Sequence, residues 1–482
     1  MRTLQRARPV QVTRLAVAVA LVAAVVTAVL PTTTATAATG PRTVVSLTFD
    51  DANANQRTGA AILDRHGLDG TFYVPSGYIG APGYLTLADL QALKAAGHEI
   101  GGHTVSHPDL PTLPADEAKR QICNDRAWLL GKGFAVRSFA YPFASLNASV
   151  KAVVAGCGYN SARGLGDLRS PSSCSGCAVA ETLPPAEAFE TRAPDQVETS
   201  WTLKNLQDIV TRAETRGGWV QITFHNVCAS GCDISVTPTV LDQFASWLKA
   251  RTTAATRNTQ VLTVGDAVGG AVKPAVNGPA APGPIGPGVN GIVNPGLETL
   301  DADGTPSCWM TGGYGTNTAA VSVTSPGRTG ARAGRVTVSG YVDGDAKWLP
   351  RFDSGGCSPT VAPGRTYSLR SWYTSTTVTQ FAVYLRDTQG AWHYWTSSPW
   401  FAATSTWTQA MWTTPAIPSG MTGISFGLSL FGNGTLRTDD VAIYDSLGAP
   451  STGGGAVSAA RLATAPQVSK AVEAPTVKHL ED

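Results

Sequence analysis

The alternation of strand-like and helix-like segments between residues 42 and 270 most constrains what this chain can fold into. Apolar runs such as TVVSLTFD (43–50) and WVQITFHN (219–226) are typical of buried strands, whereas TLADLQALKAAG (86–97) has leucines at helical spacing. Strands that are connected through helices pair in parallel. About seven such strands in this stretch predict an α/β fold, a (β/α) barrel.

The chain changes character after this region. Residues 271–290 are rich in proline and glycine and predict a linker. Residues 291–446 contain short alternating runs such as AAVSVT (319–324) and FAVYLRD (381–387), which predict an all-β jelly-roll sandwich. Residues 447–482 are dominated by small residues, and we expect this tail to be disordered.

The first 38 residues are typical of a secretory signal peptide. Arginines precede an apolar stretch (15–30), and Ala35 and Ala37 then form an A-x-A pattern with cleavage near Ala37 or Ala38. An uncleaved anchor helix is the alternative. No other segment is apolar enough to cross a membrane, so we expect an extracellular mature protein without a membrane span. We also expect a monomer.

Charge excludes one class of partner. The 36 basic and 34 acidic side chains nearly balance, and the sequence has no strongly basic stripe. Electrostatic binding of nucleic acid depends on such a stripe, so we expect no nucleic-acid partner.

Eight cysteines in an exported chain indicate disulfides rather than metal thiolates. Six precede residue 270 and two follow it, so each half can form its own bridges. A zinc ribbon would need a second C-x-x-C motif, which is missing. The predicted pairs are Cys228–Cys232, Cys308–Cys357, Cys123–Cys157 and Cys174–Cys177.

Ionisable side chains follow several of the predicted strands. Asp50 and Asp51 end the first strand, and two adjacent carboxylates are costly to bury without a cation or proton between them. His103 and His107 follow another strand, and His225 ends the strand 219–226. Separately, each has an ordinary explanation: a solvated turn, a polar surface loop or a core histidine. Together they would share the edge where parallel α/β folds bind ligands, and two histidines with one carboxylate are a common zinc set.

Four short motifs occur in order along this half of the chain. TFDD (48–51), HTVSHP (103–108), YPF (141–143) and ITFH (222–225) resemble the successive motifs of polysaccharide deacetylases of the NodB-homology type, carbohydrate esterase family 4. The resemblance covers about Thr43 to Gly270. It implies a distorted (β/α) barrel that removes acetyl groups from polysaccharide amino sugars or from xylan.

The resemblance also implies roles for individual residues. Asp50 would be the catalytic base and His225 the catalytic acid, with Asp195 as a candidate partner of this histidine. A divalent metal ion, zinc with cobalt or manganese as alternatives, would be held by three side chains. These are Asp51, His103 and His107. The turn Tyr141, Pro142 and Phe143 would border the oxyanion and the substrate, with a backbone N–H near Tyr141 helping to hold the oxyanion.

The chain departs from the family pattern before this turn. The family usually has an arginine there that orients the base, but this chain has Ala140, and Arg137 lies out of register. What orients Asp50 is therefore open.

The second half carries a weaker resemblance. NPGLE (294–298) and TDDVAIYD (438–445) are similar to segments of galactose-binding-like domains and carbohydrate-binding modules, which implies a structural calcium at Glu298 and Asp440. Eight of the twelve tryptophans lie between residues 309 and 412. Aromatic faces bind sugars, but they also fill sandwich cores, so both explanations stay open.

These features predict a secreted, metal-dependent polysaccharide deacetylase, a hydrolase of amide bonds in N-acetylglucosamine polymers such as chitin or peptidoglycan. The alternatives are an acetyl xylan esterase of the same family and a non-catalytic carbohydrate-binding protein. A metallopeptidase would usually carry an H-E-x-x-H helix, which is missing from the sequence.

Overall fold

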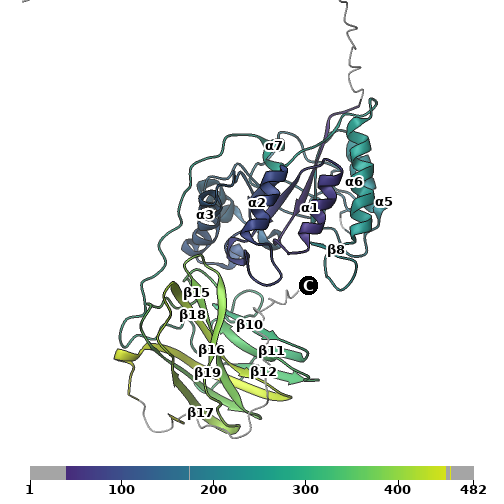
Figure 1. The fold of residues 1–482 in the computed structure, drawn as a ribbon. Coiled ribbons are helices and arrows are strands. Elements are labelled where there is room, and N and C mark those ends of the chain that lie inside the picture. Colours follow the sequence, from purple (N-terminus) through teal and green to yellow (C-terminus); the bar gives the residue numbers. More distant parts are fainter. Residues whose placement is uncertain (1–39, 173, 452–455, 458–482) are drawn as a thin grey trace, which may run out of the picture. The chain divides into compact units, whose positions relative to one another are not determined.

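A parallel sheet forms the first half of the protein in this computed structural model, which describes residues 40–172, 174–451 and 456–457 (Figure 1). The strand order is β5-β4-β3-β2-β1-β6, and β9 pairs in parallel with the first residues of β1. The strands are β1 (Thr43–Phe49), β2 (Gly70–Val74), β3 (Glu99–Gly102), β4 (Ser138–Ala140), β5 (Ser161–Arg163), β6 (Gly218–Phe224) and β9 (Thr259–Val261).

Helices connect these strands, as the alternation in the sequence predicts. They are α1 (Gln56–Arg65), α2 (Leu87–Ala96), α3 (Ala115–Gly131), α4 (Ala148–Gly156), α5 (Leu203–Glu214), α6 (Pro238–Thr253) and α7 (Val264–Val268). Thr86 caps α2 in a capping box with Asp89, and Gly97 ends it with a φ of 107°. Short 3-10 turns also occur, η1 (Ser76–Tyr78), η2 (Leu110–Thr112) and η3 (Pro142–Ala144).

The last predicted strand of this half is present with other bounds. The apolar run VLTV (261–264) predicts a strand there, but β9 covers Thr259–Val261 and α7 begins at Val264. Thr263 accepts a hydrogen bond from the backbone N–H of Asp266 and thereby caps the helix.

Three neighbouring strands at the centre of the sheet, β2, β1 and β6, are in register where they end. Phe49 pairs with Phe72 of β2 and with Phe224 of β6, and its ring stacks on theirs at 4.7 and 5.3 Å between centroids. The residues that follow these phenylalanines therefore emerge at the same level. This register brings Asp50 beside His225, whose neighbour Phe224 accepts a hydrogen bond from the Asp50 N–H at 2.9 Å.

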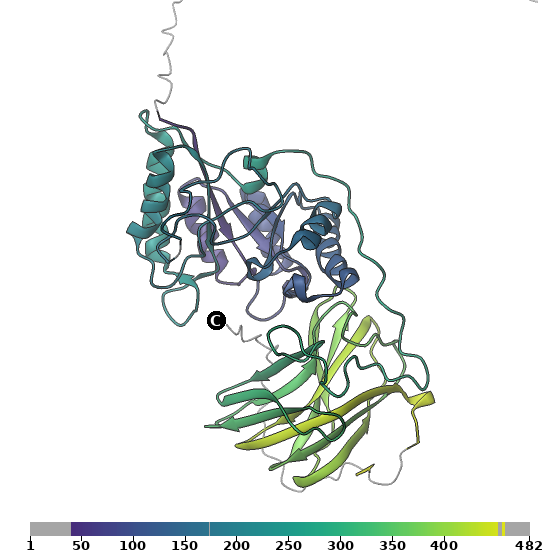
Figure 2. The ribbon, with the colours of Figure 1, turned by 180° about the vertical axis from the view of Figure 1, so that it is seen from behind.

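An irregular segment joins the two edges of the sheet (Figure 2). Thr191 bridges to Arg163 at the end of β5, and Glu181 bridges to Trp219 in β6. Val197 also donates to the carbonyl of Thr223 at 2.8 Å. The result is the expected distorted (β/α) barrel, in which this segment takes the place of a regular strand. Two short strands, β7 (Asn226–Val227) and β8 (Ser235–Val236), pair separately.

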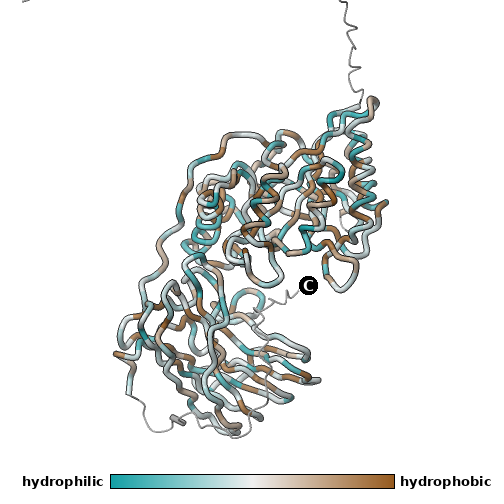
Figure 3. Tube along the Cα trace, in the orientation of Figure 1, coloured by the Kyte–Doolittle hydropathy of each residue, from teal (hydrophilic) through white to brown (hydrophobic). Residues whose placement is uncertain are grey.

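The second half is a β-sandwich, as predicted. One sheet has the order β10-β13-β18-β15-β16, and the other β11-β12-β19-β14-β17-β20. The strands are β10 (Trp309–Tyr314), β11 (Thr318–Thr324), β12 (Ala333–Ser339), β13 (Asp345–Pro350), β14 (Tyr367–Ser375), β15 (Thr379–Asp387), β16 (Trp392–Ser397), β17 (Thr404–Thr413), β18 (Met421–Leu430), β19 (Gly434–Asp445) and β20 (Ala456–Val457). Hydrophobic and hydrophilic residues alternate along strands of this half (Figure 3). In β12, Val336 and Val338 are buried and Arg335 is exposed.

Several of the sandwich tryptophans have a structural explanation. Trp309 and Trp348 belong to the core, and the Trp392 ring stacks on Phe352 at 4.6 Å. The Arg328 guanidinium lies 3.6 Å from the centre of the Trp372 ring. Binding of a sugar by this domain therefore stays a prediction.

The two ends of the chain are described only in part. The predicted signal peptide lies outside the described residues. In the segment expected to be a tail, η4 (Ser446–Gly448) and β20 are described, and β20 pairs with β17. Within the described ranges, no helix is both long and apolar enough to span a bilayer.

All four predicted disulfides are present, Cys123–Cys157, Cys174–Cys177, Cys228–Cys232 and Cys308–Cys357. The first connects α3 to the end of α4, with a sequence separation of 34 between the cysteines. The last connects the start of β10 to residue 357 of the sandwich across 49 residues.

Replacing both Cys308 and Cys357 by serine is expected to lower the free energy of unfolding of the sandwich by about 2–4 kcal/mol, because a cross-link over a long loop restricts the unfolded chain. Chemical denaturation of the variant, followed by tryptophan fluorescence, measures the change. The matched control is the Cys228/Cys232 double serine variant, in which the sequence separation of the cysteines is only 4, so the expected loss is smaller. Equal losses in the two variants would contradict the loop-length explanation.

Candidate active site

Asp50 and Asp51 leave β1 in different directions. Asp51 and Ala52 have φ angles of 76° and 58°, a left-handed conformation that non-glycine residues rarely adopt. This sharp turn sends the two neighbouring carboxylates to different partners: Asp50 to Arg163, and Asp51 to His103 and His107.

His103 is fixed by its backbone and by its ring. Its N–H donates to the Asp125 carboxylate at 3.1 Å, and burial raises the pKa of Asp125 to about 7. The His103 Nδ1 lies 2.7 Å from the carbonyl oxygen of Ala140. A carbonyl can only accept, so Nδ1 carries the proton and Nε2 faces Asp51 Oδ1 at 3.3 Å.

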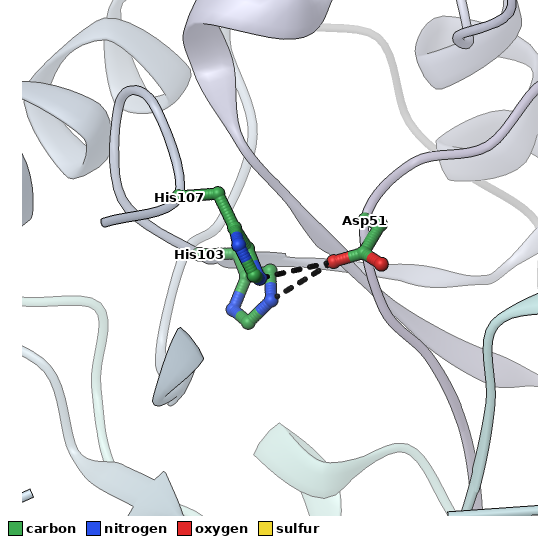
Figure 4. A group of neighbouring side chains, drawn as sticks. All are labelled: Asp51, His103 and His107. Carbon is green, nitrogen blue, oxygen red and sulfur yellow. Dashed lines mark ion pairs between the residues drawn. The ribbon is translucent and has the colours of Figure 1, made fainter. Parts of the chain in front are cut away.

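His107 completes this group from the same loop (Figure 4). Its φ of 55° is again left-handed, and its N–H donates to the Thr104 hydroxyl at 2.9 Å. Its Nε2 lies 3.2 Å from Asp51 Oδ1. The two histidines, four residues apart in sequence, are therefore brought together by a tight loop and not by a helix.

The donor set of Asp51, His103 and His107 fits a divalent cation. One carboxylate oxygen and two imidazole nitrogens lie within 4.8 Å of one another, and two histidines with one carboxylate suit zinc as well as cobalt or manganese. Burial acts to raise the pKa of Asp51, but His107, His103 and His225 hold it well below its usual range. Over the described ranges, no other group of three His, Cys, Asp or Glu side chains comes this close together.

Asp50 is 3% exposed and is held on one side only. Its Oδ2 accepts a hydrogen bond from the Arg163 guanidinium at 2.5 Å, while Oδ1 is buried without a hydrogen-bond partner in the described part of the chain. The Gln56 side chain donates to the backbone carbonyls of Asp50 and His225. Arg137, the arginine near the usual family position, instead pairs with Asp266 at 2.6 Å.

Arg163 was not among the site residues predicted from the sequence. The signal that could have identified it is a positive charge at the end of the short segment YNSARG (159–164), which contains β5. Parallel strands place such a residue at the same edge as Asp50 and His225.

His225 lies across the site from the histidine loop. Its Nε2 is 3.9 Å from Asp51 Oδ2, and its Nδ1 has no hydrogen-bond partner among the described residues. Asp195, the candidate partner, instead accepts hydrogen bonds from the hydroxyls of Ser170 and Ser172 at 3.1 and 3.2 Å.

The turn Tyr141–Phe143 borders the site. The Tyr141 hydroxyl donates to the Phe189 carbonyl at 2.8 Å, and its backbone N–H donates to the Arg163 carbonyl at 3.2 Å. Pro142 is buried and has no N–H. Phe143 has a φ of 56° and a 57% exposed side chain, and its ring meets the His107 ring edge-on at 4.7 Å. The Tyr141 N–H thus already has a partner within the protein, and the contact of a backbone N–H near Tyr141 with an oxyanion stays a prediction.

These side chains surround one cavity of about 530 Å³. The residues predicted from the sequence that line this cavity are Asp50, Asp51, His103, His107, Tyr141, Phe143 and His225. Asp195 and Glu198 line the same cavity. Pro142 belongs to the turn but does not line the cavity.

The two carboxylates proposed for calcium lie in the sandwich, next to the segment 328–332. Asp440 accepts hydrogen bonds from the Arg328 guanidinium and the Thr329 hydroxyl, both at 2.6 Å. Glu298 accepts the N–H of Arg332 at 2.9 Å. Calcium at Glu298 and Asp440 stays a prediction.

Comparison with known proteins points to one family. Residues 37–162 match the family model described as polysaccharide deacetylase. An uncharacterized 30.6 kDa protein of Geobacillus stearothermophilus is 33% identical over 81 residues, and the peptidoglycan-N-acetylmuramic acid deacetylase PdaA of Bacillus subtilis is 31% identical over 80. Each alignment covers 16% of this chain and 29% of the relative, so the chain spans less than a third of these curated relatives.

Solved structures include a similar protein as well. The structure of the peptidoglycan deacetylase PdaC from Bacillus subtilis is 19% identical, with a TM-score of 0.29. The alignment covers 47% of this chain and 89% of that chain.

Proposed function

We propose, from the polysaccharide deacetylase domain that residues 37–162 match, that this chain is a metal-dependent hydrolase that removes acetyl groups from a polysaccharide. The observation that carries the proposal is the convergence of Asp51, His103 and His107 next to the buried Oδ1 of Asp50, which has no hydrogen-bond partner among the described residues. A base with one oxygen available, beside a cation-binding group, suits the activation of a water molecule.

The chain's own residues then divide the chemistry. Asp51, His103 and His107 would hold the cation, which when bound lowers the pKa of a water molecule and polarises the acetyl carbonyl. Asp50 accepts the proton of the attacking water through its Oδ1. His225, on the other side of Asp51, donates a proton from Nε2 to the leaving nitrogen.

The substrate that we favour is an N-acetylglucosamine polymer, chitin or the glycan of peptidoglycan. An amine leaving group must be protonated as the C–N bond breaks, and we assign that proton to His225, which lines the same cavity. Acetylated xylan is the alternative substrate, and a carbohydrate-binding protein without activity is the alternative function.

Compartment and domain organisation belong to the same proposal. Four disulfides suit an oxidising compartment, which supports export of the protein. We divide the chain into a catalytic barrel (42–270), a linker (271–290) and a sandwich (291–446) that binds the polysaccharide, and we expect a monomer.

Acetate release tests the proposal directly. The full chain is incubated separately with chitin oligomers, peptidoglycan and acetylated xylan, each with added zinc and with a chelator. We expect zinc-supported release from one of the N-acetylated polymers and loss of at least about 100-fold with the chelator, because the water is then no longer activated. Release from xylan alone would favour the esterase. No release from any polymer by folded, zinc-loaded protein would contradict the enzymatic proposal.

A further inference from the structure

We propose that the outer face of the six-stranded sheet of the sandwich binds carboxylate groups of an acidic glycan through Arg335 and Arg437. This inference rests on the proposed function, because it gives the place and the chemistry by which the sandwich would hold the polysaccharide. Of the polymers favoured above, it selects the glycan of peptidoglycan, which carries lactyl carboxylates, over chitin, which has none.

The two arginines lie directly opposite each other on neighbouring strands. Arg335 of β12 pairs with Arg437 of β19 in the antiparallel register. The next pair along these strands, Val336 and Leu436, belongs to the buried core, so the arginines point to the other face of the sheet. Arg335 is exposed and Arg437 is half-buried. The two cationic side chains therefore leave the outer face from the same place.

This pairing carries a cost that the described chain does not offset. Like charges directly opposite each other on antiparallel strands repel. Neither arginine forms an ion pair with a described carboxylate. Asp439 and Asp440, which follow in β19, instead accept hydrogen bonds from residues 328–329. An anion from outside the chain would remove the repulsion.

Arg437 is held in place and still has donors for a ligand. Its guanidinium carbon lies 5.0 Å from the centre of the Trp407 ring, a cation–π contact, and one terminal nitrogen donates to the Pro326 carbonyl. Its Nε has no hydrogen-bond partner among the described residues. A guanidinium has five N–H donors, and a carboxylate accepts two of them at once. The orientation of Arg437 is therefore fixed while most of its donors are left for a carboxylate.

Hydroxyl groups extend the site on both sides of the arginines. Ser322 of β11 pairs with Arg335, and Thr374 of β14 pairs with Arg437. Residues that pair directly point to the same face. Ser322 is exposed and Thr374 is half-buried. Neighbouring strands lie about 4.8 Å apart, so this row across four strands is about 14 Å long and suits several sugars of a chain.

The composition of this row identifies the class of ligand. Its hydroxyls can exchange hydrogen bonds with the hydroxyls of any sugar, charged or neutral. A neutral glycan, however, would leave the repulsion between Arg335 and Arg437 in place, whereas a carboxylate between them forms charge-assisted hydrogen bonds with both. A carboxylate-bearing glycan is therefore the ligand that fits.

The test measures binding of two soluble oligosaccharides by the full chain, with a chelator present to prevent turnover. One alternates N-acetylglucosamine with N-acetylmuramic acid, and the other is the chitin oligomer of equal length, which lacks the lactyl carboxylates. We expect the acidic oligosaccharide to bind at least about tenfold more tightly at low salt, as for two exposed ion pairs. This preference should disappear at about 1 M salt, where the screening length is about 3 Å.

Variants assign the preference to the two arginines. Arg335→Gln and Arg437→Gln should each weaken binding of the acidic oligosaccharide about three- to fivefold, and the double variant should bind both oligosaccharides equally. Arg335→Lys keeps the charge and should keep most of the preference. Arg335→Gln should melt no lower than the parent, because it removes a like-charge pair.

Arg65→Gln is the matched control. Arg65 lies on α1 of the barrel and pairs with Asp242 at 2.8 Å, with 59% of its side chain exposed. Its loss removes one positive charge elsewhere on the chain and should leave both affinities unchanged.

Two results would overturn the inference. The first is equal binding of the two oligosaccharides by the parent at low salt. The second is a folded double variant that keeps the preference of the parent. Acetate release is measured separately, so a parent that released no acetate but kept the salt-sensitive preference would contradict the enzymatic proposal and leave this inference standing.

Discussion

A His103→Ala variant is expected to lose both its bound metal and its acetate release. His103 supplies one of the three side chains that converge within 4.8 Å, and its Nδ1 is held by the Ala140 carbonyl so that Nε2 faces the site. Loss of a residue that only supports a ligand costs about 10- to 100-fold in affinity, so removal of the ligand itself should cost at least about 1,000-fold. Zinc per protein after dialysis, and competition with a chromogenic chelator, measure this loss.

His66→Ala is the matched control for that experiment. His66 follows α1 and pairs with Asp242 at 2.8 Å, outside the group of metal-binding side chains. The control should keep both zinc and activity. A His103→Ala variant that deacetylates at the parent rate without bound metal would remove the metal site from the mechanism.

Asp50→Asn is expected to keep the metal and lose turnover. The amide is nearly the same shape as the carboxylate, and its oxygen can still accept the hydrogen bond from Arg163. It is a far weaker base than a carboxylate, and general base catalysis contributes about 10²- to 10⁴-fold. We therefore expect a kcat loss of about 1,000-fold, with zinc affinity within about threefold of the parent.

The neighbouring residue provides the contrast. Asp51→Asn should weaken zinc binding as well as activity, because Asp51 Oδ1 is the oxygen that faces both histidines. Asp208→Asn, on the exposed face of α5, controls for the loss of a carboxylate and should change neither quantity. An Asp50→Asn variant with unchanged kcat would show that another group takes the proton.

Most of the site can be predicted from local sequence. The runs around TVVSLTFD and WVQITFHN are apolar enough to be buried strands, and parallel pairing places the residues after these strands at one edge of the sheet. Asp50, Asp51, His103, His107 and His225 all lie within a few residues of a strand end. The convergence of these residues could therefore be predicted once the strands were assigned and taken to run in parallel.

The remainder depends on contacts between distant segments. β5 is three residues long and carries no periodic signal, so the meeting of Arg163 with Asp50 depends on the curvature of the whole sheet. Residues 181–197 close the barrel through isolated β-bridges, and their sequence has no alternating pattern that would predict a strand. At residues 261–264 the apolar run favoured a strand, but the cap supplied by Thr263 favoured a helix.

The left-handed backbone at Asp51, Ala52, Thr104 and His107 bears on any attempt to engineer this protein for heat tolerance. Such conformations at non-glycine residues cost about 1–3 kcal/mol each. A library ranked by melting temperature alone would therefore find its easiest gains in the two loops that hold the carboxylate and the histidines. Those variants would be harder to unfold and poorer at their reaction, so a screen for robustness has to keep these loops fixed or score turnover in the same round.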